Sequence, residues 1–317
     1  MLLQIGLTLG ISPQSHVISK DVRLVVLPVT VTDRERQFVE DLDRANFRVY
    51  EEGHLQTLTL FEHEDMPVTA GLVVDHSASM YARKVEVVEG AAAFVQSSNS
   101  HDEEFVVNFN DEVRLGLPPN VPFSSNVNDL KAALSTASAG GMTALYDAIE
   151  VAVEHLRRAH TEKKVLILIT DGEDTASKHH FAEVLDMAQT FNVMIYGVGL
   201  FNDSEVSNKA FHRRTEQQRN FLWDEDKKVL TQLAEGTGGA AYFPNSLDEV
   251  RRVCRQIAAD IRHQYTLGYS PTNDRRGGYR KIRVKVVGTN QKKLAVRTRA
   301  GYVFTTEPRF ESIAHQE

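Results

Sequence analysis

The segment Lys163–Thr170, KKVLILIT, is the feature of this 317-residue chain that most restricts its fold. Residues 165–169 are all apolar, so both faces of a strand here would carry apolar side chains, because neighbouring residues in a strand point to opposite sides. A strand of this kind is typical of the centre of a parallel sheet that helices cover on both sides. We therefore expect an α/β protein built around this strand.

Strands and helices alternate on both sides of this segment. The expected strands are 68–75, 104–110, 163–170 and 193–199, and the expected helices are 79–97, 129–137, 144–159, 177–191, 226–235 and 246–263. The buried stripe of helix 79–97 is expected to consist of Val85, Val88, Ala92, Phe94 and Val95. Residues 200–226 are polar and irregular, which predicts a surface insertion. The alternation predicts a doubly wound, Rossmann-like, mostly parallel sheet.

The two flanks of the chain differ in composition from the middle and are rich in β-branched residues and predicted turns. The expected strands are 22–32, a hairpin formed by FRVY and LQTLTLF, and three C-terminal strands in QYTLGYS, YRKIRVKVV and KKLAVRTR. Each flank is too small to fold alone, so we expect both to combine into one discontinuous, β-sandwich-like domain. The predicted boundaries are a flexible N-terminus or degenerate signal at 1–15, β segments at 16–66 and 264–305, the α/β domain at 67–263 and a tail at 306–317.

Composition removes several classes of function. The net charge of −7 gives no support for general nucleic-acid binding. No apolar run reaches the ~18 residues that a membrane span needs. The single cysteine, Cys254, cannot form an internal disulfide, and its helical spacing with Val250 and Ile257 predicts a core position. The apolar stretch at residues 1–11 lacks a basic leading region, so it is no clear signal peptide.

Oxygen-bearing side chains follow the predicted strands at three places. Asp75-x-Ser77-x-Ser79 ends the first strand, Thr143 opens a helix after Gly140-Gly141, and Asp171 ends the strand 163–170. Ligands of open α/β sheets bind at the carboxyl ends of the strands, and oxygen ligands suit a hard cation such as Mg²⁺. The alternative for the first loop is a helix cap made by Ser77 or Ser79. Because all three loops lie at the same edge of the predicted sheet, a metal site is favoured over a cap.

These motifs, DHSAS, GGMTALYDA and ITDGED, resemble the metal-ion-dependent adhesion site of the von Willebrand factor A (integrin I-like) domain family. The flanks LPVTVTD, FRVYEEG and YTLGYSP resemble its bacterial, acidobacterial VWFA-related subgroup. The resemblance implies that Ser77, Ser79 and Thr143 bind Mg²⁺ (or Mn²⁺ or Ca²⁺) directly, while Asp75 and Asp171 act mainly through bound waters. It also implies a non-enzymatic adhesion or interaction module, in which the metal captures a Glu or Asp of a protein partner.

Other interpretations of the site remain open at the level of the sequence. A metal-assisted hydrolase or phosphatase would need a general base, for which Glu173 or Asp174 are candidates, although both are expected to lie in a solvated acidic turn. A structural assembly subunit with a vestigial site is the third hypothesis. We expect His76, in the variable position of the first motif, to be exposed and uninvolved. The resemblance favours a periplasmic or extracellular location, and no nucleic-acid partner is expected.

Overall fold

The computed structural model describes residues 24–63, 65–99, 101–136, 139–201, 216–272, 278–288 and 293–303. The expected N-terminal segment 1–15 and tail 306–317 therefore lie outside the described residues, as does part of the predicted insertion. None of the helices in the described ranges is long and apolar enough to cross a membrane.

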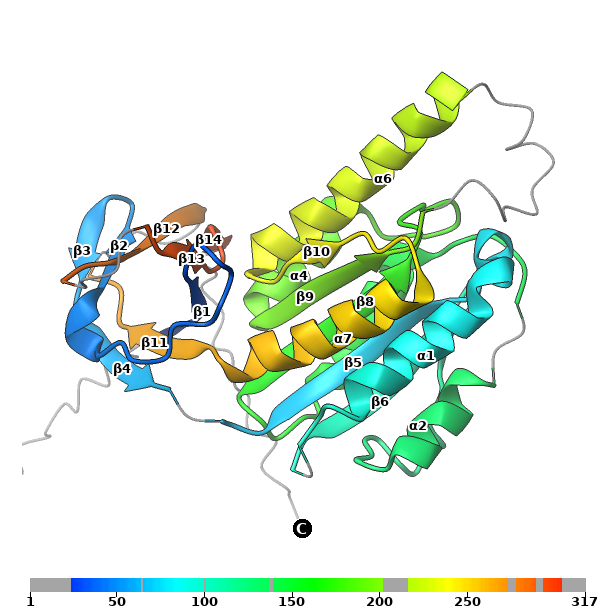
Figure 1. The fold of residues 1–317 in the computed structure, drawn as a ribbon, viewed down its shortest axis with the longest axis horizontal. Coiled ribbons are helices and arrows are strands. Elements are labelled where there is room, and N and C mark those ends of the chain that lie inside the picture. Colours follow the sequence, from blue (N-terminus) through cyan, green and yellow to red (C-terminus); the bar gives the residue numbers. More distant parts are fainter. Residues whose placement is uncertain are drawn as a thin grey trace, which may run out of the picture.

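A six-stranded sheet forms the centre of the larger domain (Figure 1). Its strand order is β10-β9-β8-β5-β6-β7, and all neighbours are parallel except β6 and β7. The strands are β5 (Val68–Asp75), β6 (Glu103–Phe109), β7 (Val113–Leu115), β8 (Lys163–Thr170), β9 (Val193–Gly199) and β10 (Ala241–Tyr242). Residues 165–169 of β8 are fully buried, as their apolar character on both faces predicts.

Helices cover both faces of this sheet. Helices α1 (Lys84–Val95) and α7 (Leu247–Arg262) pack against each other in front of the sheet in Figure 1. Helices α3 (Leu145–Leu156), α4 (Phe181–Thr190) and α6 (Glu216–Thr237) form a second packed set, and α2 (Val127–Leu134) lies beside α1. Cys254 on α7 is fully buried, as predicted, and burial raises the pKa of its thiol to about 12. The predicted α/β fold class is confirmed.

The two flanks form two four-stranded sheets with a shared apolar core, built around Leu27, Phe47, Tyr265 and Ile282. One sheet has the order β13-β1-β11-β4 and the other β14-β12-β2-β3. Their strands are β1 (Val25–Thr32), β2 (Phe47–Glu51), β3 (His54–Gln56), β4 (Leu58–Glu62), β11 (Tyr265–Tyr269), β12 (Tyr279–Val286), β13 (Ala295–Arg297) and β14 (Gly301–Val303), with one 3-10 turn, η1 (Arg44–Asn46). Each sheet combines strands from both ends of the chain, so the predicted discontinuous β domain is confirmed.

Several element predictions are wrong in detail. The expected helix 79–97 begins as a 3-10 helix, η2 (Ala78–Arg83). Val85 is exposed, and Val87 and Ala91 are buried instead, so the buried face of α1 differs from the predicted one. The polar stretch up to 226 contains the first half of α6. LQTLTLF splits between the sheets, since β3 pairs with β2 and β4 with β11.

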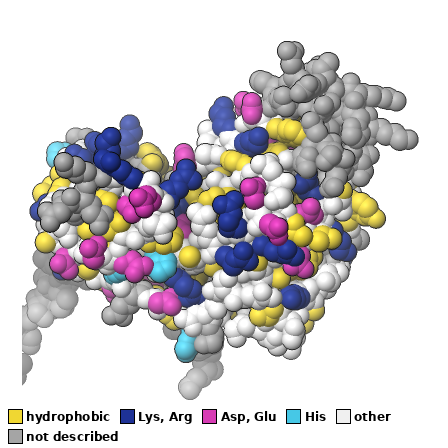
Figure 2. Space-filling view, viewed as in Figure 1, with side chains coloured by type: hydrophobic (Ala, Val, Ile, Leu, Met, Phe, Trp, Pro, Cys, Tyr) yellow, Lys and Arg dark blue, Asp and Glu magenta, His cyan; other side chains and the backbone are white. Residues whose placement is uncertain are grey.

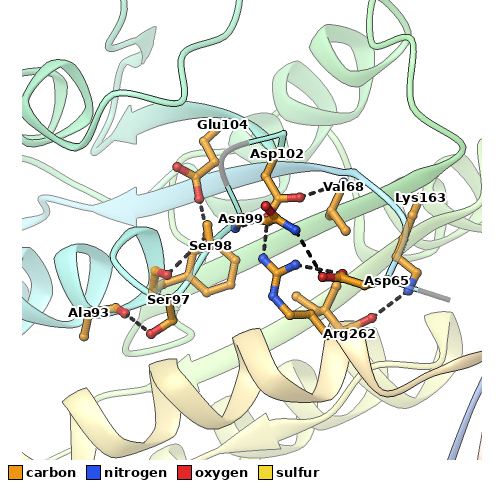
Figure 3. A network of polar contacts seen from close by, with 12 residues as sticks. Asp65, Val68, Ala93, Ser97, Ser98, Asn99, Asp102, Glu104, Lys163 and Arg262 are labelled. Carbon is orange, nitrogen blue, oxygen red and sulfur yellow. Dashed lines mark hydrogen bonds and ion pairs between the residues drawn. The ribbon is translucent and has the colours of Figure 1, made fainter.

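A buried polar network joins the two domains, and a second, partly exposed network lies where the chain crosses between them. In the first, the Asp260 carboxylate on α7 accepts hydrogen bonds from Thr30 Oγ1 on β1 and Tyr196 Oη on β9, both at 2.8 Å, and it pairs with Arg297 of β13. In the second, Arg262 forms ion pairs with Asp65 and Asp102 at 2.8 and 2.5 Å (Figure 3). These contacts fix the β domain near one end of the central sheet, opposite the carboxyl ends of β5 and β8.

Candidate metal centre

Two carboxylates lie side by side at the carboxyl edge of the central sheet. Asp75 is the last residue of β5, and Asp171 directly follows β8. Strands β5 and β8 are parallel neighbours, with Val74 opposite Ile169. Their ends therefore bring the two acids together, although 96 positions separate them in the chain. The sequence pattern predicted this edge for both residues, and the structure places them there.

The loop after β5 is folded around the Asp75 carboxylate. Ser77 N–H donates to Asp75 Oδ1 at 2.8 Å, and Thr170 Oγ1 donates to Asp75 Oδ2 at 2.6 Å. The hydroxyls of Ser77 and Ser79 lie 3.1 Å apart. Ser77 precedes η2 but makes no side-chain capping bond, so the helix-cap interpretation of Ser77 is wrong. Both serine hydroxyls instead face one another beside the carboxylate.

Thr143 comes to the same edge on a second loop, which two glycines shape. Gly140 and Gly141 have φ values of +136° and +86°, which L side chains rarely adopt. Gly140 N–H donates to the His76 carbonyl at 2.8 Å, and Ala78 N–H donates to the Gly141 carbonyl at 3.2 Å. These bonds tie the threonine loop directly to the serine loop.

The third loop closes the arrangement by bonding to the second. Thr175 and Ala176 N–H donate to the Thr143 carbonyl at 2.8 and 2.9 Å, and Thr143 N–H donates to Thr175 Oγ1 at 3.1 Å. Ser79 also hydrogen-bonds the Asp171 carboxylate. All five residues singled out from the sequence, Asp75, Ser77, Ser79, Thr143 and Asp171, are therefore held in one set of connected loops. Their role as metal ligands stays a prediction.

Two neighbouring carboxylates at a largely enclosed position are electrostatically unfavourable. Burial, followed by the negative charge of Asp171, raises the pKa of Asp75 from 3.8 to about 7. Burial also raises the pKa of Asp171, against the Ser79 hydrogen bond and the positive charge of Arg83. The Oδ1 atom of Asp171 is buried and has no hydrogen-bond partner. A cation at this point would compensate both negative charges and the unpartnered oxygen.

The donor set fits a hard cation. Three hydroxyls and two carboxylates provide only oxygen atoms, the ligands that Mg²⁺, Mn²⁺ and Ca²⁺ prefer. Within the described ranges, no three His, Cys, Asp or Glu side chains gather into a ligand group of their own. The candidate site depends on its hydroxyls for that reason, and Ser77, Ser79 and Thr143 are the residues that would complete it.

His76 does not behave as expected. The side chain is 5% exposed, and its Nε2 atom lies 2.9 Å from Asn108 Oδ1 on β6. Burial lowers the pKa of the imidazole. The prediction of an exposed, uninvolved histidine is therefore wrong: His76 is a buried, hydrogen-bonded residue whose carbonyl also anchors Gly140.

Sequence reasoning missed several residues that shape the loops. Thr170 binds Asp75 directly, and its position immediately before Asp171 is the only local signal for it. Asp174 accepts a hydrogen bond from Ser177 Oγ at 2.5 Å and lies 3.3 Å from Tyr146 N. Asp174 is thus part of the loop scaffold and not only a solvated charge, whereas Glu173 is exposed as predicted.

Comparison with known proteins points to one family. The family model of the von Willebrand factor type A domain matches residues 71–253. An uncharacterized protein of Borreliella burgdorferi is 30% identical over 108 residues, which cover 33% of this chain and 31% of that protein. Inter-alpha-trypsin inhibitor heavy chain H4 of Bos taurus is 30% identical over 122 residues, which cover 36% of this chain and 13% of that protein. The matched region thus spans less than a third of either relative.

A solved structure extends the likeness beyond the α/β domain. The structure described as von Willebrand factor type A from Catenulispora acidiphila aligns with a TM-score of 0.52 and 12% sequence identity. The alignment covers 90% of this chain and 74% of that one. At this identity the likeness concerns the fold alone.

Proposed function

The chain belongs to the von Willebrand factor type A domain family, and we propose that its loop edge binds a divalent cation through which it captures a carboxylate of a protein partner. Domains of this family typically mediate protein–protein interaction. The observation that carries the metal proposal is the buried, unpartnered Oδ1 atom of Asp171 beside the Asp75 side chain, whose residue is only 1% exposed. Buried charges are otherwise paired or coordinate a metal.

The five residues divide into two roles under this proposal. Ser77, Ser79 and Thr143 would hold the cation through neutral hydroxyls. Asp75, fixed by Ser77 N–H and Thr170 Oγ1, would orient this set and compensate the charge from further away, together with Asp171. A divalent ion that neutral ligands hold stays electron-poor and therefore attracts an anionic oxygen. A Glu or Asp side chain of a partner supplies such an oxygen.

A hydrolytic role has less support from the same loops. Metal-assisted hydrolysis requires a general base within reach of the attacking water. Of the two candidates, Asp174 is engaged with Ser177 and Tyr146. Glu173 is exposed to solvent, and the contact that ties it to the site is a backbone hydrogen bond to the Asp171 carboxylate. We therefore propose binding and not turnover as the function of this edge.

Calorimetric titration of the full chain with Mg²⁺ and Mn²⁺ tests the metal proposal. Thr143→Val keeps the size and branching of the side chain but removes its hydroxyl, so we expect cation affinity to fall at least tenfold while the melting temperature stays near that of the wild type. Thr59→Val, on β4 of the other domain, is the matched control and should leave affinity unchanged. Equal cation binding by wild type and Thr143→Val would refute the site.

A capture experiment tests the binding role. The immobilised chain is exposed to candidate partner proteins in Mg²⁺ and then washed with EDTA, in parallel with Thr143→Val. We expect partners to be released by EDTA and absent from the variant. Partners that remain bound in EDTA would show recognition that does not depend on the metal.

A further inference from the structure

Three large apolar side chains are exposed around the candidate metal centre. Tyr81, Val85 and Met142 are 64%, 61% and 57% exposed. They are three of the eight large hydrophobic side chains that are exposed in the described part of the chain. Isolated surface apolar residues need no explanation, but a group of them beside a site points to a contact surface.

The loops of the site bring these three residues together. Tyr81 lies on η2, two positions after Ser79, and Val85 follows four positions later at the start of α1. Met142 directly precedes Thr143, and the Ala78–Gly141 hydrogen bond joins its loop to the start of η2. In Figure 2, hydrophobic side chains are visible at the right-hand end of the view, where Figure 1 shows the start of α1. We name Tyr81, Val85 and Met142 the apolar rim.

The apolar rim is a consequence of local backbone geometry. Val85 lies at the start of α1, whose buried face carries Val87 and Ala91, so Val85 is exposed to solvent. Met142 is held outside by the turn at Gly140 and Gly141, whereas Thr143 next to it is buried.

Acidic residues also lie next to the site. Glu173 follows Asp171 after one residue and is exposed, and Gly172 lies against the backbone of Asp226 on α6. A partner with several adjacent carboxylates would meet repulsion from them. The surroundings therefore favour a single carboxylate among apolar neighbours.

We infer that the partner segment carries one acidic residue flanked by large apolar side chains, which pack on Tyr81, Val85 and Met142 while the carboxylate is directed at the cation site. This inference rests on the proposed function and specifies the chemistry of the partner. The cation attracts one anionic group, and the apolar rim, which water now covers, contributes affinity when a matching apolar surface covers it. The acidic residues next to the site discriminate against acidic runs.

Synthetic nine-residue peptides test this inference. Four fluorescein-labelled peptides share Gly-Ser flanks and differ in the centre: Phe-Glu-Leu, Ser-Glu-Ser, Glu-Glu-Glu and Phe-Gln-Leu. Fluorescence anisotropy measures their binding to the full chain in Mg²⁺ and in EDTA. We expect Phe-Glu-Leu to bind about tenfold more tightly than Ser-Glu-Ser or Glu-Glu-Glu in Mg²⁺, the gain expected from one partly buried apolar side chain.

Variants separate the apolar rim from the metal centre. The double variant Tyr81→Ser/Met142→Ser should bind Phe-Glu-Leu and Ser-Glu-Ser equally, with cation affinity unchanged. Leu55→Ser on β3, whose side chain is also 57% exposed, is the matched control and should keep the tenfold preference.

The results test the apolar rim, carboxylate capture and the metal centre separately. Equal affinity of the wild type for Phe-Glu-Leu and Ser-Glu-Ser, a preference that survives in the double variant, or no binding of Phe-Glu-Leu would overturn the inference about the apolar rim. Equal binding of Phe-Gln-Leu and Phe-Glu-Leu, unaffected by EDTA, would instead overturn carboxylate capture. Cation titration reports on the metal centre separately from either.

Discussion

At the scale of single residues, the carboxyl group of Asp75 determines how the loop edge responds to pH. Burial and the neighbouring Asp171 raise its pKa from 3.8 to about 7 in the folded chain. An unfolded chain has an ordinary Asp pKa of about 4. Above pH 7 the group is charged in both states, and the folded state carries the full penalty of a buried charge beside another carboxylate. As the pH falls below 7, the folded state takes up a proton first and the penalty disappears.

Because of Asp75, the free energy of unfolding of the metal-free chain should therefore be lower at pH 8 than at pH 5.5. Urea unfolding in EDTA measures the difference, and Asp75→Asn, which keeps the shape of the side chain but cannot ionise, should reduce it by on the order of 2 kcal/mol. The stabilisation that Mg²⁺ adds should show the opposite trend and be larger at pH 8, because protons compete with cations. An unchanged pH dependence in Asp75→Asn would show that other groups govern it.

The positions of individual site residues were predictable where the local sequence pattern indicates them. Asp75 and Asp171 each end an apolar strand, and parallel strands end at one edge, so their proximity followed from the sequence. The burial of His76 did not, because it depends on Asn108, 32 positions away on β6. The sequence predicts Thr170 only as the end of a strand, because no neighbouring residue indicates that its hydroxyl donates to a carboxylate on another strand.

At the scale of elements, the glycine turn before Thr143 holds the loops together. Gly141 has a φ of +86°, and an added Cβ would lie 1.9 Å from Asp111 Oδ1. Gly53, in the turn between β2 and β3, has a similar φ of +81° but no atom within 4 Å of an added Cβ. Alanine at either position meets the same backbone strain, but only Gly141 lies in a loop of the candidate site.

Substituting each glycine with alanine tests this element. Both Gly141→Ala and Gly53→Ala should lose about 1 kcal/mol of stability, because an L residue is strained at positive φ. Only Gly141→Ala should also weaken cation binding, since its backbone strain acts on the loop that carries Thr143, whereas Gly53 lies in the other domain. Calorimetry and thermal unfolding measure the two effects. Wild-type cation affinity in Gly141→Ala would show that this turn does not position the site.

Strongly periodic elements were predictable, and elements that depend on winding or on polar helix faces were not. Strands β5, β8 and β9 lie where apolar runs predicted them. The change from η2 to α1 has no periodic signal, since a 3-10 turn has the same residue types as an α-helix. The sequence predicts an irregular insertion for the first half of α6 because polar and charged residues predominate there, and the fully buried residues Leu230 and Leu233 lie in its second half.

At the scale of the whole molecule, buried polar contacts link the two domains into one structure. The β domain takes strands from both ends of the chain, so the α/β domain is inserted into it, and the chain crosses between the domains near residues 63–67 and 262–264. Hydrophobic pattern and segment size predicted that the flanks combine. The pattern did not predict the contacts at the junction, because Thr30, Asp260 and Arg297 are polar residues far apart in sequence and have no periodic relationship.

Asp260 is the centre of this junction. Its side chain is 3% exposed, and it binds Thr30, Tyr196 and Arg297, which belong to three different strands of the two domains. Removing the Asp260 carboxylate leaves Arg297 without its counter-charge and two hydroxyls without their acceptor, which costs about 3 kcal/mol. Asp260→Ala should therefore lower the free energy of unfolding by that amount in urea titrations. Asp248→Ala, on the same helix with a 94% exposed side chain, should change it by less than about 0.5 kcal/mol.

The location of the effect distinguishes a junction from an ordinary stabilising contact. If Asp260 couples the domains, Asp260→Ala should speed backbone hydrogen exchange in β1 and β13, which lie in the β domain, as well as in α7. Cation affinity should stay unchanged, because the site lies at the opposite end of the central sheet. Exchange that increases in α7 alone would mean that Asp260 stabilises its own helix, and that the β domain does not depend on this network.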